Sequence, residues 1–332
     1  MPDALPVRFA DIEAAATRIA GHAVRTPLLE SPQLNALTGG RILIKPECLQ
    51  RTGSFKFRGA WNRISQIDPA TTPGGVVAYS SGNHAQGVAA AAAMRGLKAL
   101  IVMPADTPAI KQANTRGYGA EVVTYDRASQ SREEIAGRIA RERGAIIVPP
   151  FDDPHIIAGQ GTVGLELAED AARLGASLDA VLVPCSGGGL VGGIATAVKS
   201  RMPKASIHSV EPAGFDDLAR SLAAGKRLAN DRTTGSICDA LLSPTPGEIT
   251  FAINSKLLAP GLAVSDGEAG AAMAYAFDRL KLVAEPGGAV ALAAILSGKV
   301  DVRGRTVAVI ISGGNVDRAL YARILIENPS LP

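Results

Sequence analysis

The sequence predicts an α/β protein built from two parallel-sheet, three-layer sub-domains with a ligand cleft between them. Apolar strand-like runs alternate with helical runs along almost the whole chain. These strands are too many for one comfortable sheet, and 332 residues are long for one domain. We therefore expect a large discontinuous domain over 1–70 and 150–332 and a small domain over 74–148, with a chain that crosses between them more than once.

The first half of the chain is expected to follow a regular strand–helix order. The expected strands are "RILIKPE" at 41–47, "GGVVAYSS" at 74–81, "KALIVMP" at 98–104 and "AEVVTYD" at 120–126. The helices that follow them are expected at 55–67, 83–96, 107–119 and 131–144. Such alternation implies parallel strands whose connecting helices cover both faces of a sheet.

The second half contains further strands, with one glycine-rich strand end leading directly into a helix. The strands are expected at 145–150, 179–189, 205–212 and 305–315, and the helix at 190–203. Three strand ends in the whole chain carry Gly/Ser-rich turns, namely "SSGNH", "CSGGGL" and "SGGN". Because ligands of open α/β sheets bind beyond the carboxyl ends of the strands, these turns indicate one shared crevice.

Charge and composition exclude several classes of partner. The balance of 34 Lys and Arg against 31 Asp and Glu leaves a net charge of +3, too small to indicate nucleic acid or an anionic membrane. The longest apolar runs are much shorter than the roughly 20 residues that cross a bilayer, and the N-terminus lacks a secretion signal. Three separated cysteines form neither a disulfide framework nor a C-x-x-C pair. We expect a cytoplasmic protein.

The segment "VPCSGGGLVGG" at 183–193 predicts an anion-binding loop. Consecutive glycines allow backbone N–H groups to converge, and the start of the following helix adds partial positive charge. The loop lacks the Gly-Lys-Ser/Thr ending of a nucleotide P-loop, which argues against a nucleoside triphosphate. The alternative is a tight strand–helix turn without a ligand.

The segment "GQGTVG" at 159–164 matches the dinucleotide fingerprint only in its letters. No strand precedes it, and no ribose-binding acid ends a strand about 20 residues later. We interpret it as a closely packed, glycine-rich helix start. An NAD-dependent dehydrogenase is therefore not expected.

The segment "SSGNHAQG" at 80–87 ends a strand with two hydroxyls, an amide and an imidazole. Capping the next helix needs one such side chain, and this turn has four. A helix start with so many donors suits a carboxylate, such as the α-carboxylate of an amino acid. The turn therefore predicts part of a substrate site.

Lys56 lies between Phe55 and Phe57, which is an unusual position for a surface ammonium. Apolar surroundings lower the pKa of a lysine, and only the neutral amine attacks an aldehyde. Together with the two donor-rich turns, this lysine indicates a phosphorylated aldehyde cofactor, pyridoxal 5′-phosphate. The alternative is an ordinary exposed helix lysine.

The motifs "GSFKFRGA", "SSGNHAQG", "AGQGT", "PCSGGGL", "EP" and "SGGN" occur in the order found in one enzyme family. The chain resembles pyridoxal-phosphate enzymes of the tryptophan-synthase-β fold type, and most closely the serine/threonine dehydratase and serine racemase branch, which includes 3-hydroxyaspartate dehydratases. The similarity runs from about residue 26 to about residue 317. It implies a lyase that eliminates the β-hydroxyl of an amino acid and yields a 2-oxo acid and ammonia.

The resemblance also implies site residues. Lys56 would bind the cofactor covalently and exchange the Cα proton of the substrate, and Ser312 would contact the pyridine nitrogen. Because Ser312 is neutral, it would favour prompt loss of the β-substituent over a long-lived carbanion. The implied cofactor ligands are Phe55, Lys56, Asn83, Ser186, Gly187, Gly188, Gly189, Glu285 and Ser312, and the implied substrate ligands are Ser80, Ser81, Asn83, His84, Arg132 and Ser243.

Arg132 bears on the choice of substrate. It matches an arginine that faces a second carboxylate in serine racemase-like proteins, with Ser243 as a nearby polar contact. An arginine–carboxylate pair would favour 3-hydroxyaspartate over L-serine or L-threonine. The alternative is that Arg132 is an ordinary exposed helix residue.

The segment "VEPAGFDDLARSL" at 210–222 resembles the cation-binding segment of the same branch. Glu211, Asp217 and the carbonyl of Phe215 match its ligands, and this oxygen-rich set suits Mg²⁺, or alternatively Ca²⁺ or Mn²⁺. The other interpretation is a solvated acidic helix start. The resemblance further implies a homodimer.

Other activities stay open at this level. Ser81 matches a serine that acts on the face opposite the lysine in racemising relatives, so an amino-acid racemase is the main alternative. A β-replacement synthase and an amino-acid sensor without turnover are further interpretations. All of them predict a small amino acid as the ligand.

Overall fold

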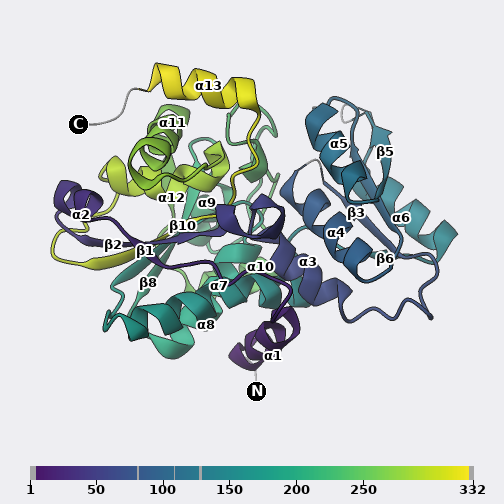
Figure 1. Ribbon diagram of the computed structural model, residues 1–332, viewed down its shortest axis with the longest axis horizontal. Coiled ribbons are helices and arrows are strands. Elements are labelled where there is room, and N and C mark those ends of the chain that lie inside the picture. Colours follow the sequence, from purple (N-terminus) through teal and green to yellow (C-terminus); the bar gives the residue numbers. More distant parts are fainter. Residues whose placement is uncertain (1–4, 81, 108, 127–128, 329–332) are drawn as a thin grey trace.

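The computed structural model describes residues 5–80, 82–107, 109–126 and 129–328. Figure 1 shows a larger body and a smaller one, which confirms the expected two-sheet α/β fold. The larger body has a six-stranded sheet in the order β1-β2-β10-β7-β8-β9, and the smaller has a four-stranded sheet in the order β5-β4-β3-β6. All pairings are parallel except the antiparallel pair of β1 and β2.

The structure contains every expected strand and two more. The additional strands, β1 and β9, are two and three residues long, too short to give a pattern in the sequence. The expected strand at 145–150 shrinks to two residues. The strands are β1 (Leu29–Glu30), β2 (Arg41–Pro46), β3 (Val76–Tyr79), β4 (Ala99–Pro104), β5 (Glu121–Tyr125), β6 (Ile146–Ile147), β7 (Ala180–Pro184), β8 (Ser206–Pro212), β9 (Leu262–Val264) and β10 (Thr306–Ile311).

The helices follow local capping rules. For example, the Ser131 hydroxyl accepts from the Glu134 N–H at the start of α6, and Gly144 ends this helix at a φ of 63°. The helices are α1 (Phe9–Ile19), α2 (Pro32–Thr38), α3 (Lys56–Ile64), α4 (Asn83–Met94), α5 (Ala109–Gly117), α6 (Arg132–Arg143), α7 (Pro154–Arg173), α8 (Gly189–Arg201), α9 (Asp217–Ala224), α10 (Glu248–Leu257), α11 (Asp266–Tyr275), α12 (Pro286–Leu296) and α13 (Arg318–Glu327). No helix in the described ranges is long and apolar enough to cross a membrane.

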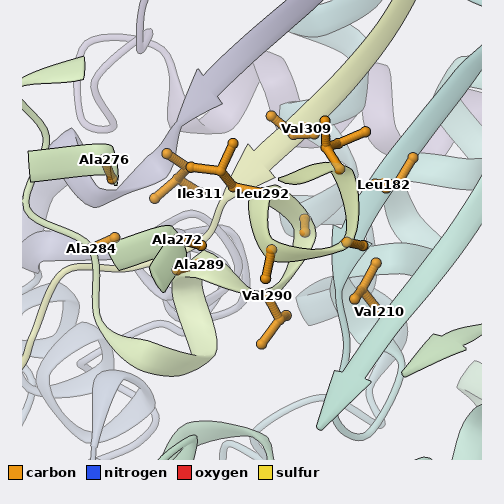
Figure 2. Close-up of a cluster of buried hydrophobic side chains, with 14 of the residues drawn as sticks. Leu182, Val210, Ala272, Ala276, Ala284, Ala289, Val290, Leu292, Val309 and Ile311 are labelled. Atoms are coloured by element: carbon orange, nitrogen blue, oxygen red, sulfur yellow. The ribbon is translucent and has the colours of Figure 1, made fainter. Parts of the chain in front are cut away.

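The core of the larger body forms around α12. Every residue from Pro286 to Ile295 in this helix is buried, so the helix is apolar on all sides. Figure 2 shows Ala289, Val290 and Leu292 of α12 among side chains of strands β7, β8 and β10. The helix therefore covers one face of the six-stranded sheet and fixes the position of Glu285, which immediately precedes it.

Helix α3 lies where the two bodies meet. It packs on α7 of the larger body and on α4 of the smaller one. A Cβ atom on Gly159 would lie 2.6 Å from Cα of Gly59, so glycines allow α3 and α7 to approach closely. The "GQGTVG" segment is thus part of the interior of α7, rather than its start, and its glycines serve helix packing.

The strands of the smaller sheet, from Val76 to Ile147, lie inside the range 74–148 expected for the small domain. Strands of the larger sheet come from both sides of that range. The exact domain boundaries stay a prediction.

Candidate active site

One pocket collects most of the predicted site residues from both bodies. The three Gly/Ser-rich turns all contribute to its wall, as the sequence predicted. Ser81 lies outside the described residues. The predicted residues that line the pocket are Phe55, Lys56, Ser80, Asn83, His84, Arg132, Ser186, Gly187, Gly188, Gly189, Ser243, Glu285 and Ser312.

Lys56 is the first residue of α3, and its ammonium group is held inside the pocket. Nζ donates to the carbonyl oxygen of Pro150 at 2.7 Å and lies 5.3 Å from the centre of the Phe55 ring. Burial lowers the pKa of Lys56 to about 8, although the nearby Glu285 carboxylate opposes this shift. The lowered pKa favours the neutral form of the amine, which is the nucleophilic one.

The glycine loop leads from β7 into α8. The carbonyls of Gly187 and Gly188 accept from Thr250 Oγ1 at 2.6 Å and from Asn254 Nδ2 at 3.1 Å, so α10 binds the loop through its carbonyl groups. The first backbone N–H groups of a helix have no hydrogen-bond partner within the helix. Helix α8 begins at Gly189, which lines this pocket, so its free N–H groups are available there. A Cβ atom on Gly187 would lie 2.4 Å from the Phe151 ring, so only glycine fits there. The loop suits a phosphate group.

A polar cluster lies opposite this loop. Asn83 Nδ2 donates to Glu285 Oε1 at 2.5 Å, and Asn315 Nδ2 donates to Asn83 Oδ1 at 2.7 Å. Burial, with a contribution from Asp239, raises the pKa of Glu285 to about 7. Ser312 follows β10, and its backbone carbonyl accepts from the Phe55 N–H at 3.1 Å. A buried lysine with a lowered pKa, a glycine loop at a helix start, and amide and hydroxyl side chains lining the same pocket fit pyridoxal phosphate.

The imidazole of His84 differs from a simple cationic carboxylate ligand. Nε2 lies 2.9 Å from the Val148 carbonyl, and because a carbonyl only accepts, Nε2 carries the proton. Burial and the nearby Lys56 lower the pKa of His84 to about 3, so the ring is neutral. Its Nδ1 is buried without a partner among the described residues. The donors available to a carboxylate are the backbone N–H groups at the start of α4.

Arg132 begins α6 and lines the pocket from the smaller body. Its Nε donates to Glu133 Oε1 at 2.8 Å, and its guanidinium lies 5.4 Å from the centre of the Tyr79 ring. Tyr79 ends β3 and precedes Ser80. On the other side of the cleft, Ser243 Oγ accepts from Ser186 Oγ at 2.8 Å.

The candidate metal residues lie outside this pocket. The two Glu211 oxygens accept from the backbone N–H groups of Leu218 at 3.0 Å and Ala219 at 2.8 Å. Asp217 Oδ1 accepts from Asn230 Nδ2 at 2.7 Å, whereas the buried Oδ2 has no partner among the described residues. Burial raises the pKa of Asp217 to about 6 and, with Asp217 adding to the effect, raises that of Glu211 well above its usual range.

Two buried carboxylates with one unpartnered oxygen fit a divalent cation, with the Phe215 carbonyl as a further oxygen ligand. Phe215 lies between Glu211 and Asp217 in the sequence, and its side chain is buried. The described residues contain no group of three or more His, Cys, Asp or Glu that could bind a metal. A site of this kind would therefore depend on backbone oxygen and water as well as on carboxylates.

The structure adds pocket residues that the sequence did not predict as ligands. Asn315 was visible as the last letter of "SGGN", and Phe151 follows a strand end, but neither had an assigned role. Lys111 and Asp239 gave no signal, since each looks like an ordinary surface charge. The additional residues that line the pocket include Tyr79, Lys111, Phe151, Gln160, Asp239 and Asn315.

Comparisons with known proteins identify the family of this chain. A family model described as pyridoxal-phosphate dependent enzyme matches residues 19–313. L-threo-3-hydroxyaspartate ammonia-lyase from Pseudomonas sp is 44% identical over 317 residues, covering 96% of this chain and 98% of that protein.

Two solved structures share the fold. A threonine deaminase (from T.th.) has a TM-score of 0.88 at 46% identity, covering 93% of this chain and 99% of that one. Maize serine racemase has a TM-score of 0.90 at 37% identity, covering 97% and 98%. The resemblance seen in the motifs is thereby confirmed, and the chain belongs to the family of pyridoxal-phosphate dependent enzymes.

Proposed function

We propose that this protein is a pyridoxal-phosphate-dependent ammonia-lyase that converts L-threo-3-hydroxyaspartate to a 2-oxo acid and ammonia. The observation that carries the proposal is the presence of Arg132 in the same pocket as Lys56 and the start of α4. Serine and threonine have no second carboxylate for this arginine. The similarity to the Pseudomonas ammonia-lyase, over almost the full length of both chains, supports the same substrate.

The two carboxylates of the substrate have separate partners in this proposal. The start of α4, with Ser80, Asn83 and the backbone of His84, binds the α-carboxylate. Arg132 binds the side-chain carboxylate, and Ser243 contributes a hydroxyl across the cleft. Ser81 is included in the carboxylate site on the strength of the resemblance alone. A substrate held at both ends has its Cα fixed near Lys56.

The proposed cofactor ligands follow the pocket geometry. Gly187, Gly188 and Gly189, with Ser186, bind the phosphate, and Phe55 lies against the ring. Asn83, Glu285 and Ser312 are assigned to the polar atoms of the ring, and the support is that all three line the pocket. They are assigned together with Lys56, which anchors the group covalently.

Lys56 is the proposed acid and base. Pyridoxal phosphate, when bound, would supply an electron sink that makes the Cα proton of the substrate acidic. Once the amino group of the substrate has replaced Lys56 on the cofactor, the freed Lys56 amine would remove that proton, and burial lowers the pKa of this amine as a base near neutral pH needs. Lys56 would pass this proton to the β-hydroxyl, which leaves as water, and hydrolysis of the resulting imine then replaces the amino group with oxygen and releases ammonia. Water is lost once and gained once, so the net products are oxaloacetate and ammonia.

We further propose that Glu211, Asp217 and the Phe215 carbonyl bind Mg²⁺, with Ca²⁺ and Mn²⁺ as alternatives. The support is the unpartnered, buried Oδ2 of Asp217. Asn230 donates from Nδ2 to both Asp217 and the Ser243 carbonyl, at 2.7 and 2.9 Å, and so connects the metal residues to the pocket. The cation would thus stabilise the segment that carries Ser243.

Two further proposals concern the state of the protein. A homodimer is supported by the resemblance to racemases and dehydratases, and light scattering on the purified protein tests it. A cytoplasmic location is supported by three free cysteines, of which Cys185 and Cys238 are buried. Cell fractionation tests the location.

The decisive experiment measures 2-oxo acid release from L-serine, L-threonine and the four stereoisomers of 3-hydroxyaspartate, with Mg²⁺ present. We expect turnover of the L-threo isomer to exceed that of serine and threonine. Lys56→Ala should abolish both turnover and the absorption band of the bound cofactor. Preferred release from serine or threonine would overturn the dicarboxylate assignment.

The racemase is kept as a second candidate because maize serine racemase shares the fold at 37% identity. Chiral analysis of the same reaction mixtures tests it. Inversion that is lost in Ser81→Ala, while the cofactor band stays, would support this activity. Reactions without any inverted amino acid would exclude it.

A further inference from the structure

An ion pair crosses the cleft beside the pocket and is not explained by the family resemblance. Lys111 Nζ, on α5 of the smaller body, lies 2.5 Å from Asp239 Oδ2, which belongs to the short helical turn Asp239–Leu241 of the larger body. Both residues line the pocket that contains Lys56 and Arg132. The two residues are 128 positions apart in the chain.

The two partners differ in their exposure to water. The Lys111 side chain is 17% exposed, whereas that of Asp239 is 58% exposed. A largely exposed carboxylate is well hydrated without its partner, so exchanging it for another carboxylate costs little. The lysine ammonium is more enclosed and carries three donors, so it needs an anionic partner. This asymmetry suits a lysine that changes partners.

The surrounding charges favour a carboxylate in this position. Arg132 lines the same pocket, and its contact with Glu133 lies at the surface, where that carboxylate is 53% exposed. Lys111 and Arg132 thus supply two cations from the smaller body. The proposed function assigns the α-carboxylate to the start of α4 and the cofactor phosphate to the glycine loop, so Lys111 and Arg132 are available for a second carboxylate of the substrate.

We propose that Lys111 is a specificity-determining residue that binds the side-chain carboxylate of a dicarboxylic substrate together with Arg132. In the absence of substrate, Lys111 pairs with Asp239 instead. This inference rests on the proposed function and extends it to a residue without a signal in the sequence. When the substrate carboxylate replaces Asp239, the Lys111–Asp239 ion pair between the two bodies is lost, and Lys111 pairs with the substrate instead. Binding of a dicarboxylate is thereby coupled to the arrangement of the cleft.

The test compares Lys111→Met, Asp239→Asn and the control Lys98→Met in the holoenzyme. Lys98 is an exposed lysine of the smaller body outside the pocket. Calorimetric titration measures the affinity for malonate, a dicarboxylate, against propionate, a monocarboxylate. Lys111→Met should weaken malonate at least about tenfold relative to propionate, as expected for loss of a charge-assisted hydrogen bond. Asp239→Asn should tighten malonate several-fold, because the competing charge is gone, and Lys98→Met should change neither.

Two outcomes would overturn the inference. Unchanged malonate affinity in Lys111→Met would show that the lysine contacts no substrate carboxylate. Weakened malonate binding in Asp239→Asn, to the same degree as in Lys111→Met, would show that the ion pair only maintains the shape of the cleft. Kinetics provide the second readout, in which the kcat/KM ratio of L-threo-3-hydroxyaspartate to L-serine falls in Lys111→Met. If the unaltered enzyme does not turn over hydroxyaspartate, the proposed function fails, while the malonate titration still tests Lys111.

Discussion

Arg58, two residues after Lys56, is fully buried between two glutamates. Its Nε and Nη2 donate to Glu47 at 2.7 and 2.8 Å, and Nη1 and Nη2 donate to Glu166 at 2.7 and 2.9 Å. Lys45, also buried, donates to Glu166 at 2.7 Å, so the cluster balances two positive with two negative charges. We predict that Arg58→Met destabilises the protein severely, because Lys45 is hydrogen-bonded to Glu166 and Glu47 then has no hydrogen-bonded cation, although the Thr26 hydroxyl still donates to its Oε1 at 2.6 Å.

The magnitude follows from that single unpaired charge. Breaking a buried ion pair by removing one partner costs about 3–5 kcal/mol. The exposed pair of Arg41 and Glu30, 3.0 Å apart, provides the matched control, and Arg41→Met should cost less than about 1 kcal/mol. Urea unfolding measures both variants, and Trp61, the single tryptophan, reports directly on α3.

The pH dependence adds a sign test. Burial by itself would raise the pKa of Glu47, but Arg58 outweighs burial and the pKa is lowered. Glu47 therefore contributes to the stability of the folded protein, and this contribution is lost as the pH falls through the folded pKa. Because Arg58 is the main cause that opposes burial, we expect the folded pKa of Glu47 in Arg58→Met to lie above its unfolded value, so that acidification favours the folded variant. The gap between Arg58→Met and wild type should therefore narrow from pH 7 to pH 5. A gap below about 1 kcal/mol at pH 7, or one that widens on acidification, would refute this reasoning.

Three further predictions concern the cofactor and the metal. Gly188→Ala should weaken cofactor affinity at least about tenfold, because Gly188 has a φ of +92° and an added Cβ would lie 2.6 Å from Asn254 Nδ2. Fluorescence titration with the cofactor measures this affinity. The control Gly225→Ala, at a φ of +66° in open space, should leave the affinity unchanged. The rate of cofactor attachment to the apoprotein should rise with pH and level off above about 8, because Lys56 reacts only when neutral; a pH-independent rate would contradict the lowered pKa. Chelation by EDTA should lower the melting temperature and Mg²⁺ should restore it, whereas Asp217→Ala should abolish both responses. An identical EDTA response in that variant would place the cation elsewhere.

The short motifs of this chain were sufficient to predict the fold class and the wall of the pocket. A strand followed by glycines and a helix is a local pattern, and parallel strands of one sheet bring their carboxyl ends to one edge, so the turns at Ser186 and Ser312 had to meet. Ser80 follows β3 of the other sheet, and it joins them because the two sheets face the same pocket. Lys56 was recognisable because its neighbours in the sequence are also its neighbours in space. Such features depend on residues that are close along the chain.

Contacts between distant segments were decided only by the tertiary structure. Lys111 and Asp239 are 128 residues apart, and Arg58 and Glu166 are 108 apart, so neither partner indicates the other in the sequence. The neutral state of His84 likewise depends on a carbonyl 64 residues away. The sequence alone determined which chemical groups the chain carries and where its turns lie. Burial and pairing across the fold decided their charges, because a pKa responds to desolvation and to neighbouring charges that only the folded chain brings together.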